Sequence, residues 1–226
     1  MGGNYRSVFD IIGPVMIGPS SSHTAGAVAL GQAARKLLWQ TPHKATVHYY
    51  ESFALTHRGH GTDYAIAAGL LGLAPADARV PQAPQLARQA GLDLRFVEES
   101  GPSPIHHPNT AVIELWAGQQ RFQISGCSIG GGTIEIRAVT MHGISVQLAG
   151  ALPLALYYAP DYAQLRARQL VQHLRQLVPI KRRQIKRGQA GAVYALNLGQ
   201  ALATPQVEQL MHQYPDLEFL ALDFLK

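Results

Sequence analysis

Three short polar stretches of the chain each place a histidine beside glycine, hydroxyl or amide side chains. Because histidine ordinarily titrates near neutral pH, each of these residues could give or take a proton in a reaction. The chain contains 10 histidines, many of which will be surface or capping residues, so composition alone selects none of them. The three stretches are Gly18–Thr24 with His23, Gly59–Asp63 with His60, and His107–Asn109 with the imidazole of His107 and the amide of Asn109.

The first stretch directly precedes a run of small residues that is typical of a helix. Serine and threonine at the start of a helix accept hydrogen bonds from backbone amides, and amides left without partners point toward any anion that settles there. Ser20, Ser21, Ser22 and Thr24 are therefore candidates for binding a substrate carboxylate. The alternative is that these hydroxyls only cap the helix.

The second stretch joins a predicted strand to a predicted helix, an arrangement that presents side chains and amides to a ligand. Thr62 in this stretch is a further candidate for substrate binding. Asp63 could orient His60 or cap the helix that follows, and the pattern favours the cap. In the third stretch, we expect the side chain of His106 to point away from the site.

Helices and strands alternate through the part of the chain that carries these residues. The Ala- and Gly-rich composition of the first long helix indicates close packing, and Gly130–Gly132 allow either a close backbone approach or a bulge. The expected elements are helices at 7–12, 24–38, 64–73 and 85–90, strands at 44–52, 92–98, 110–116, 121–125 and 133–139, and a polar loop at 56–63.

A second unit follows a predicted linker at 143–150. Its expected elements are strands at 152–159, 180–186, 192–198 and 217–225, and helices at 162–177 and 204–214, with Leu165, Leu170 and Leu174 in the core. The resulting βαββαβ order suits a ferredoxin-like sandwich and is the layout of small ligand-sensing ACT domains. The predicted fold class is α/β (α+β), with a mixed α/β domain at 1–142 and a ferredoxin-like ACT-like domain at 148–226.

Composition narrows the class of protein. Of the 226 residues, 47% are hydrophobic and 15% charged, which indicates a folded globular protein with faces that a partner subunit could cover. Cys127 is the only cysteine, so the chain has no internal disulfide, cannot hold an iron-sulfur cluster by itself, and suggests a reducing compartment. No leader segment or membrane-spanning apolar run is recognisable, and we expect a cytoplasmic protein without a membrane partner.

Five motifs occur in a fixed order along the chain: SVFDIIGP at 7–14, GPSSSHTAG at 18–26, GHGTD at 59–63, HPNT at 107–110 and SIGGG at 128–132. Together they resemble the beta subunit of the iron-sulfur-dependent L-serine dehydratases, whose N-terminal domain is similar to allosteric-substrate-binding domains. The resemblance covers nearly the whole chain, including an ACT-like C-terminal module. Each motif alone would be weak, whereas the ordered set is specific.

The resemblance implies conversion of L-serine to pyruvate and ammonia with a 4Fe-4S cluster. Its cysteine ligands would belong to an alpha subunit, its iron would act as a Lewis acid on the leaving hydroxyl, and a histidine would remove the Cα proton. No metal ligand is expected in this chain, and the ACT-like domain is expected to form homodimers. The implied catalytic residues are His60, His107, Asn109 and His23, with His60 the first choice for proton transfer, and the implied carboxylate-binding residues are Ser20, Ser21, Ser22, Thr24 and Thr62.

Two other functions stay open at this point. Domains similar to the N-terminal part also serve as effector sites, so the chain could be a non-catalytic amino-acid-binding regulatory module. The basic cluster at 181–187 could bind nucleic acid, but a solvated strand edge is favoured and no nucleic-acid partner is expected. The sequence Ala159-Pro160-Asp161-Tyr162 stands where ACT domains commonly have glycine, which favours packing or dimerisation over amino-acid binding.

Overall fold

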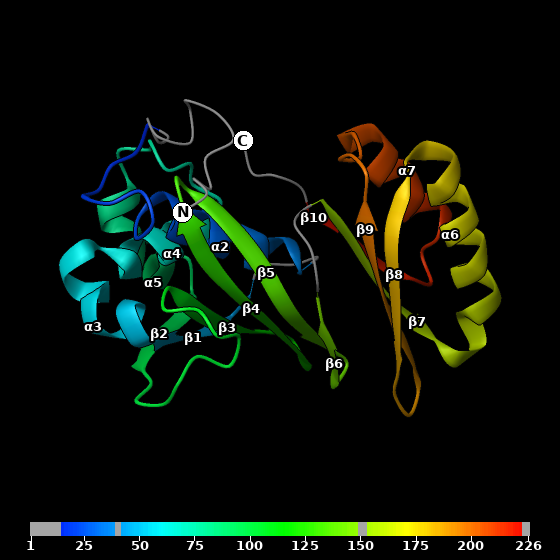
Figure 1. Cartoon of the computed structure of the whole chain (residues 1–226), viewed down its shortest axis with the longest axis horizontal. Coiled ribbons are helices and arrows are strands. Elements are labelled where there is room, and N and C mark those ends of the chain that lie inside the picture. Colours follow the sequence, from blue (N-terminus) through cyan, green and yellow to red (C-terminus); the bar gives the residue numbers. More distant parts are fainter. Residues whose placement is uncertain (1–14, 39–41, 149–152, 223–226) are drawn as a thin grey trace, which may run out of the picture. The chain divides into compact units, whose positions relative to one another are not determined.

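The computed structural model describes residues 15–38, 42–148 and 153–222 (Figure 1). The helix expected at 7–12 lies outside these residues. The chain divides into two compact units between residues 137 and 138, within the strand β5 (Thr133–Met141). The helices are α2 (Ala25–Lys36), α3 (Glu51–His60), α4 (Thr62–Leu70), η1 (Val80–Gln82), α5 (Ala83–Gln89), η2 (Asp161–Ala163), α6 (Gln164–Leu177) and α7 (Thr204–Gln213). The strands are β1 (Lys44–Tyr50), β2 (Asp93–Glu98), β3 (Thr110–Ala117), β4 (Gln120–Gly130), β5 (Thr133–Met141), β6 (Ile144–Gln147), β7 (Leu154–Pro160), β8 (Ile180–Arg187), β9 (Gly191–Leu198) and β10 (Glu218–Leu222).

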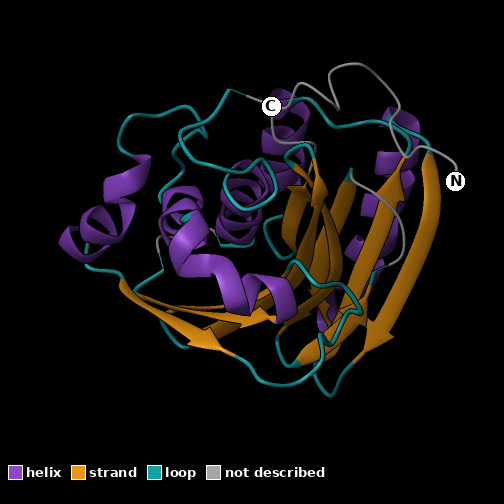
Figure 2. Cartoon of the chain, turned by 60° about the vertical axis from the view of Figure 1, so that its left-hand side comes forward, coloured by secondary structure: helices purple, strands orange, loops and turns teal. Residues whose placement is uncertain are grey.

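A six-stranded mixed sheet in the order β2-β1-β3-β4-β5-β6 forms the framework of the N-terminal part. Strand β1 pairs in parallel with β2 and in antiparallel with β3. The alternating burial of β1 puts Ala45, Val47 and Tyr49 on one buried face, as expected for a strand covered by helices on that side. Figure 2 shows the helical layer beside the sheet.

Helices α2 and α4 pack against each other through glycine. A Cβ atom on Gly69 would lie 2.2 Å from the carbonyl oxygen of Val28, so a larger residue would separate the helices. The C-terminal parts of the two helices lie together, because the side chains of Gln32 and Arg35 donate to the carbonyls of Leu73 and Leu70 at 2.8 and 2.9 Å. The close packing expected for the small residues is confirmed, and both helices begin at the same end of the pair.

Two expectations for the N-terminal part, the polar loop and the linker, are wrong in detail. The polar loop expected at 56–63 is mostly helix α3, which ends where Gly61 adopts φ +72° and α4 begins one residue later. The Gly130–Gly132 run makes the turn between β4 and β5, and all three residues have positive φ, a backbone conformation that favours glycine. The linker expected at 143–150 contains β6 where it is described.

The C-terminal unit contains the predicted βαββαβ order. Its four strands are arranged β10-β7-β9-β8 and every pair is antiparallel. Tyr157 and Tyr194 stack in the core with ring centroids 4.5 Å apart, beside the buried Leu170 and Leu174. Leu165 is 69% exposed, so its assignment to the core was wrong: it lies in the first turn of α6 on the outer side. Strand β8 is an edge strand, and its basic residues are exposed as predicted.

Within the described residues, no helix is both long and apolar enough to cross a membrane.

Candidate functional site

His23 and His60 contact each other directly. His23 lies in the turn before α2 and His60 is the last residue of α3, and their ring centroids are 4.7 Å apart in an edge-to-face arrangement. This contact follows from the packing of α2 on α4, because α3 ends immediately before α4 begins and the two parallel helices start at the same end. Two of the predicted histidine stretches therefore meet.

The surroundings of His23 favour its neutral form. Burial and, to a smaller extent, the neighbouring His60 lower the pKa of His23. Its Nδ1 lies 3.3 Å from the hydroxyl of Ser20, and the Phe53 ring packs against it at 5.1 Å. Its Nε2 is buried without a hydrogen-bond partner among the described residues. A neutral imidazole with an unused nitrogen can exchange a proton with a ligand.

Buried hydroxyls without partners lie at the starts of both parallel helices. Thr24 and Thr62 are 0% exposed, and neither hydroxyl has a hydrogen-bond partner in the described part of the chain. Thr24 does not cap α2 through its side chain, so for this residue the capping alternative is not supported. Buried polar groups are normally satisfied, and unpaired hydroxyls beside helix N-termini are suited to an anionic ligand.

The serines of the same turn differ from one another. The Ser20 carbonyl accepts from the amide of Thr24 at 2.7 Å, and the Ser21 carbonyl accepts from the amide of Gly26 at 2.9 Å. These bonds shape the turn before α2. The side chains of Ser21 and Ser22 are half-buried and make no hydrogen bond to a described residue. All three serines therefore surround the start of α2, and only Ser20 has a defined side-chain contact.

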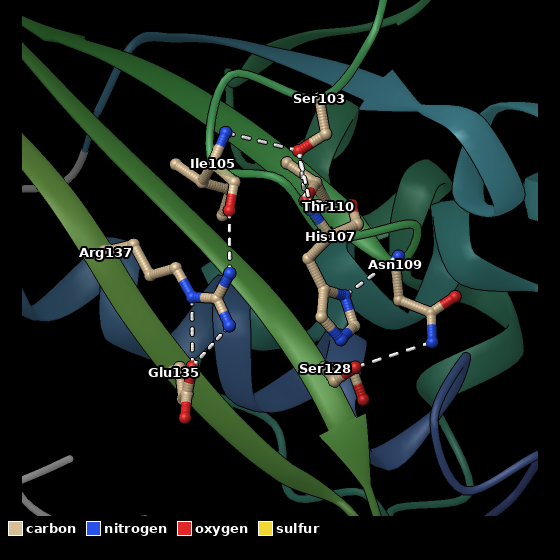
Figure 3. Close-up of polar contacts among 8 residues, drawn as sticks. All are labelled: Ser103, Ile105, His107, Asn109, Thr110, Ser128, Glu135 and Arg137. Atoms are coloured by element: carbon tan, nitrogen blue, oxygen red, sulfur yellow. Dashed lines mark hydrogen bonds and ion pairs between the residues drawn. The ribbon is translucent and has the colours of Figure 1, made fainter. Parts of the chain in front are cut away.

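His107 lies in a loop that Ser103 organises (Figure 3). The Ser103 hydroxyl donates to Thr110 Oγ1 at 2.9 Å and accepts from the amides of Ile105 and His107, both at 3.3 Å. The Thr110 hydroxyl in turn donates to the carbonyl of His107 at 2.6 Å. Ser103 and Thr110 are almost fully buried, so the hydrogen bonds that fix the loop lie in the interior of the protein. His106, by contrast, is exposed.

Asn109 connects this loop to β4 and to α2. Its amide nitrogen Nδ2 donates to the carbonyl of Ser128 at 3.4 Å, and the Ser128 amide donates to the Asn109 carbonyl at 3.1 Å. A Cβ atom on Gly26 would lie 2.2 Å from the Ser128 hydroxyl, so the first turn of α2 touches this residue. That hydroxyl is also buried without a partner among the described residues.

Phe53 provides a second link between the histidine loop and the His23–His60 pair. Its ring contacts His23, and its amide donates to the carbonyl of Pro108 at 3.3 Å. The third predicted stretch thus reaches the first through Phe53 and also through Asn109, Ser128 and Gly26. The structure brings all three stretches into one contiguous region.

An ion pair on β5 lies near His107. Arg137 contacts the Glu135 carboxylate at 2.8 and 3.0 Å and donates to the carbonyl of Ile105 at 2.7 Å (Figure 3). Burial and then the positive charge of Arg137 lower the pKa of His107, against the opposing effects of Glu135 and Glu51. His107 is therefore held in its neutral form.

Asp63 has a different partner from either of the two that the sequence suggested. Its carboxylate contacts Nδ1 of His57 at 2.6 Å, and the structure shows no side-chain cap on α4. The other ring nitrogen of His57 contacts Glu98 at 2.9 Å, and the His57 residue is 3% exposed. The prediction that Asp63 caps α4 is therefore wrong. Its carboxylate contacts the buried ring of His57, which lies one helical turn before His60.

The described residues do not fit an iron-sulfur cluster. No group of three or more histidine, cysteine or acidic side chains in that part of the chain could hold a metal ion. Cys127 is buried on β4, and burial raises the pKa of its thiol to about 11, so the thiolate that a cluster needs is disfavoured.

Sequence reasoning missed four residues that shape this region: Phe53, Ser103, Glu135 and Arg137. Glu135 and Arg137 did carry a signal, because two charged residues two positions apart point to the same face of a strand. Phe53 and Ser103 carried none, since a phenylalanine on a helix and a serine in a loop are ordinary at the sequence level.

Comparisons with known proteins identify close relatives. The family model described as "Serine dehydratase beta chain" matches residues 7–139. The "Probable L-serine dehydratase, beta chain" of Bacillus subtilis (strain 168) is 49% identical over 158 residues, which is 70% of each chain. The "L-serine dehydratase, beta chain" of Peptoniphilus asaccharolyticus is 34% identical over 155 residues, 69% of each chain. The "L-serine dehydratase TdcG" of Escherichia coli (strain K12) is 32% identical over 151 residues, which cover 57% of this chain and 33% of that protein.

Proposed function

The chain belongs to the serine dehydratase beta chain family, and we propose that it is the beta chain of an L-serine dehydratase, which converts L-serine to pyruvate and ammonia. The observation that carries the proposal to particular residues is the contact between His23 and His60 beside two buried, unpartnered threonine hydroxyls. This arrangement supplies both a proton acceptor and a place for a carboxylate, which are the two things that removal of a proton next to a carboxylate requires.

The start of the parallel helices α2 and α4 is proposed to bind the substrate carboxylate. The hydroxyls of Thr24 and Thr62 are buried and unpartnered in the described region, and Ser20, Ser21 and Ser22 surround the same helix end. Both helices direct the positive ends of their dipoles toward this point, which favours an anion.

His60 is proposed to accept the Cα proton, with His23 as its neighbour in the pair. Asn109 is proposed to contact the substrate through Oδ1, because its Nδ2 already donates to Ser128 and a carbonyl oxygen can accept from the substrate ammonium. After loss of the Cα proton and the β-hydroxyl as water, 2-aminoacrylate tautomerises to an imine, and water hydrolyses the imine to pyruvate and ammonia.

An alpha chain is proposed as the partner, and the 4Fe-4S cluster with its cysteines is assigned to that chain. Two observations support this division. The described residues offer no cluster ligands, and the matched region covers only 33% of the longer Escherichia coli relative, in which a single chain carries further sequence. Exposed apolar side chains on the segments around the site suit a partner surface: Val15, Leu55 and Ile129, which are 84%, 88% and 48% exposed.

The C-terminal unit is proposed to be an ACT-like domain that packs or forms homodimers. Its βαββαβ order and antiparallel sheet support this proposal. We also propose the functional domain limits 1–142 and 148–226, which keep β5 whole, whereas the division into compact units falls within that strand.

Co-expression with an alpha chain under anaerobic conditions tests the proposal. The complex should form pyruvate from L-serine, while the alpha chain alone should not. A Thr62→Val variant, which removes only the hydroxyl, should raise KM more than it lowers kcat. A His60→Ala variant should lose turnover with an unchanged iron content of the complex. If His60→Ala changed only the response to an added amino acid, the chain would be a regulatory module instead.

A further inference from the structure

The two nitrogens of the His107 ring have different environments. Nδ1 lies 3.1 Å from the backbone nitrogen of Asn109. A backbone N–H can only donate a hydrogen bond, so Nδ1 must accept it and carries no proton. The neutral ring therefore has its proton on Nε2, which makes no hydrogen bond to a described residue.

The loop holds the ring in this orientation from both sides. The amide of His107 donates to the Ser103 hydroxyl, and its carbonyl accepts from the Thr110 hydroxyl. Arg137 fixes the other end of the loop through the carbonyl of Ile105. Figure 3 shows Nδ1 directed to the backbone nitrogen of Asn109, and no dashed line joins Nε2 to the residues drawn.

The charged groups around His107 also disfavour a second proton. Arg137 and Glu135 approach from β5, and Glu51 approaches from the start of α3. Burial and the Arg137 charge together outweigh the two carboxylates, so the pKa of His107 is lowered. Protonation would also put a hydrogen on Nδ1, where it would face the N–H of Asn109.

We propose that His107 acts as a hydrogen-bond donor to a substrate oxygen through Nε2–H, and that it is not the base that removes the Cα proton. A general base needs a free acceptor nitrogen, and the only acceptor nitrogen of this ring is already used by the protein. This leaves the His23–His60 pair, already proposed as the site of proton transfer, as the source of the base. No bond of the ring breaks in this role, because Nε2–H only orients and polarises the oxygen. The inference rests on the proposed dehydratase function.

Two variants of the anaerobically assembled complex distinguish whether His107 acts as a hydrogen-bond donor or as a general base. His107→Gln keeps an N–H donor of similar reach but cannot accept a proton, whereas His107→Ala removes both. We expect His107→Gln to retain kcat within about 10-fold, and His107→Ala to lose about 100-fold or more, the usual effect of removing one positioned donor. Equal losses in both variants would overturn the proposal. His60→Gln is the comparison, and it should be as poor as His60→Ala.

A measurement without turnover tests the same ring. In the full chain labelled with ¹⁵N-histidine, the signals of His107 are identified by their absence in His107→Gln. We expect the Nε2–H tautomer, and titration below the ordinary histidine pKa of about 6.5. An Nδ1–H tautomer, or a charged ring at neutral pH, would overturn the inference while leaving the dehydratase assignment intact. A complex that made no pyruvate would overturn the dehydratase assignment and the donor role, and the tautomer would still be measurable.

Discussion

His57 and His60 lie one turn apart on helix α3, and their surroundings are opposite. Both nitrogens of His57 contact carboxylates, from Asp63 and Glu98, and its buried ring packs on Tyr49 at 4.7 Å. His60 is exposed and contacts the His23 ring, and neither of its nitrogens bonds to a described residue. Within a single helix, one histidine is fully used by the protein and the other is left for a ligand.

The difference shows how the fold prepares the site. Because carboxylates only accept hydrogen bonds, a ring that contacts one at each nitrogen donates from both. His57 thereby connects α3 to α4 through Asp63 and to β2 through Glu98, and the same contact and Arg58 lower the pKa of Glu98. These contacts fix the end of α3 that carries His60. His57 is a structural residue, and in the proposed mechanism it acts only through the position that it gives to His60.

The strongest test of this comparison is the loss of His60. In the complex with an alpha chain, His60→Gln should lower kcat by about 1000-fold, the middle of the range for removal of a general acid or base. The free energy of unfolding should be unchanged, since no described residue bonds to this ring. Pyruvate formation and urea denaturation measure the two quantities. The matched control is His106→Gln, because His106 is also exposed and has no role in the proposed mechanism. Equal loss in both variants would contradict the assignment.

His57→Leu should differ from His60→Gln mainly in its loss of stability. The variant leaves two carboxylates without their buried donor, and we expect the free energy of unfolding to fall by about 2 kcal/mol. Urea denaturation of the full chain gives this value from the midpoint and slope. Asp63→Asn, which weakens only one of the two contacts, should cost less. If His57→Leu kept its stability but lost turnover in the complex, His57 would belong to the chemistry and the contrast between the two histidines would fail.

The positive charge of Arg137 beside His107 should have a smaller effect, which is a shift in the pKa of His107. Protonation of His107 abolishes the acceptor at Nδ1, and the ¹⁵N-histidine spectrum of the full chain follows this step separately from protonation of His60, the proposed base. Removing the positive charge in Arg137→Met should raise the pKa of His107, and its titration should move to higher pH by about 0.5 to 1 unit. Glu135→Gln should move the titration to lower pH. Arg137→Lys, which keeps the charge, should leave it in place. A titration that moved equally in Arg137→Met and Arg137→Lys would point to the loop contact with Ile105 instead of the charge.

Much of the fold could be predicted from the sequence, because many of its helices and strands depend on residues close together in the chain. The pattern of small residues in α2, the apolar strands β7 and β9, and the start of α7 with Pro205 in its first turn are properties of short segments. The six elements of the C-terminal unit appear in the predicted order for this reason. The sequence also indicated the candidate histidines, because glycine, hydroxyl or amide residues lie beside each of them.

What the sequence did not predict depends on contacts between distant segments. Helix α3 was missed because its residues are polar and glycine-containing, and what stabilises them is His57 reaching Glu98, 41 residues away. The partner of Asp63 was missed for the same reason. The tautomer of His107 could not be predicted either, because it depends on the direction of one backbone N–H in a folded loop.

The smallest expected effect tests whether α3 must be rigid for His60 to function. Gly59 lies within α3 beside His60, and a Cβ atom there would meet nothing within 4 Å. Gly59→Ala should therefore stabilise the chain by about 0.5 to 1 kcal/mol and leave kcat unchanged. Gly61→Ala is the opposite control, because Gly61 has φ +72° and its Cβ would lie 2.0 Å from the Tyr64 ring. If Gly59→Ala raised the unfolding midpoint in urea but lowered kcat, His60 would need motion at the end of α3. The His57 contacts would then limit the reaction as well as position it.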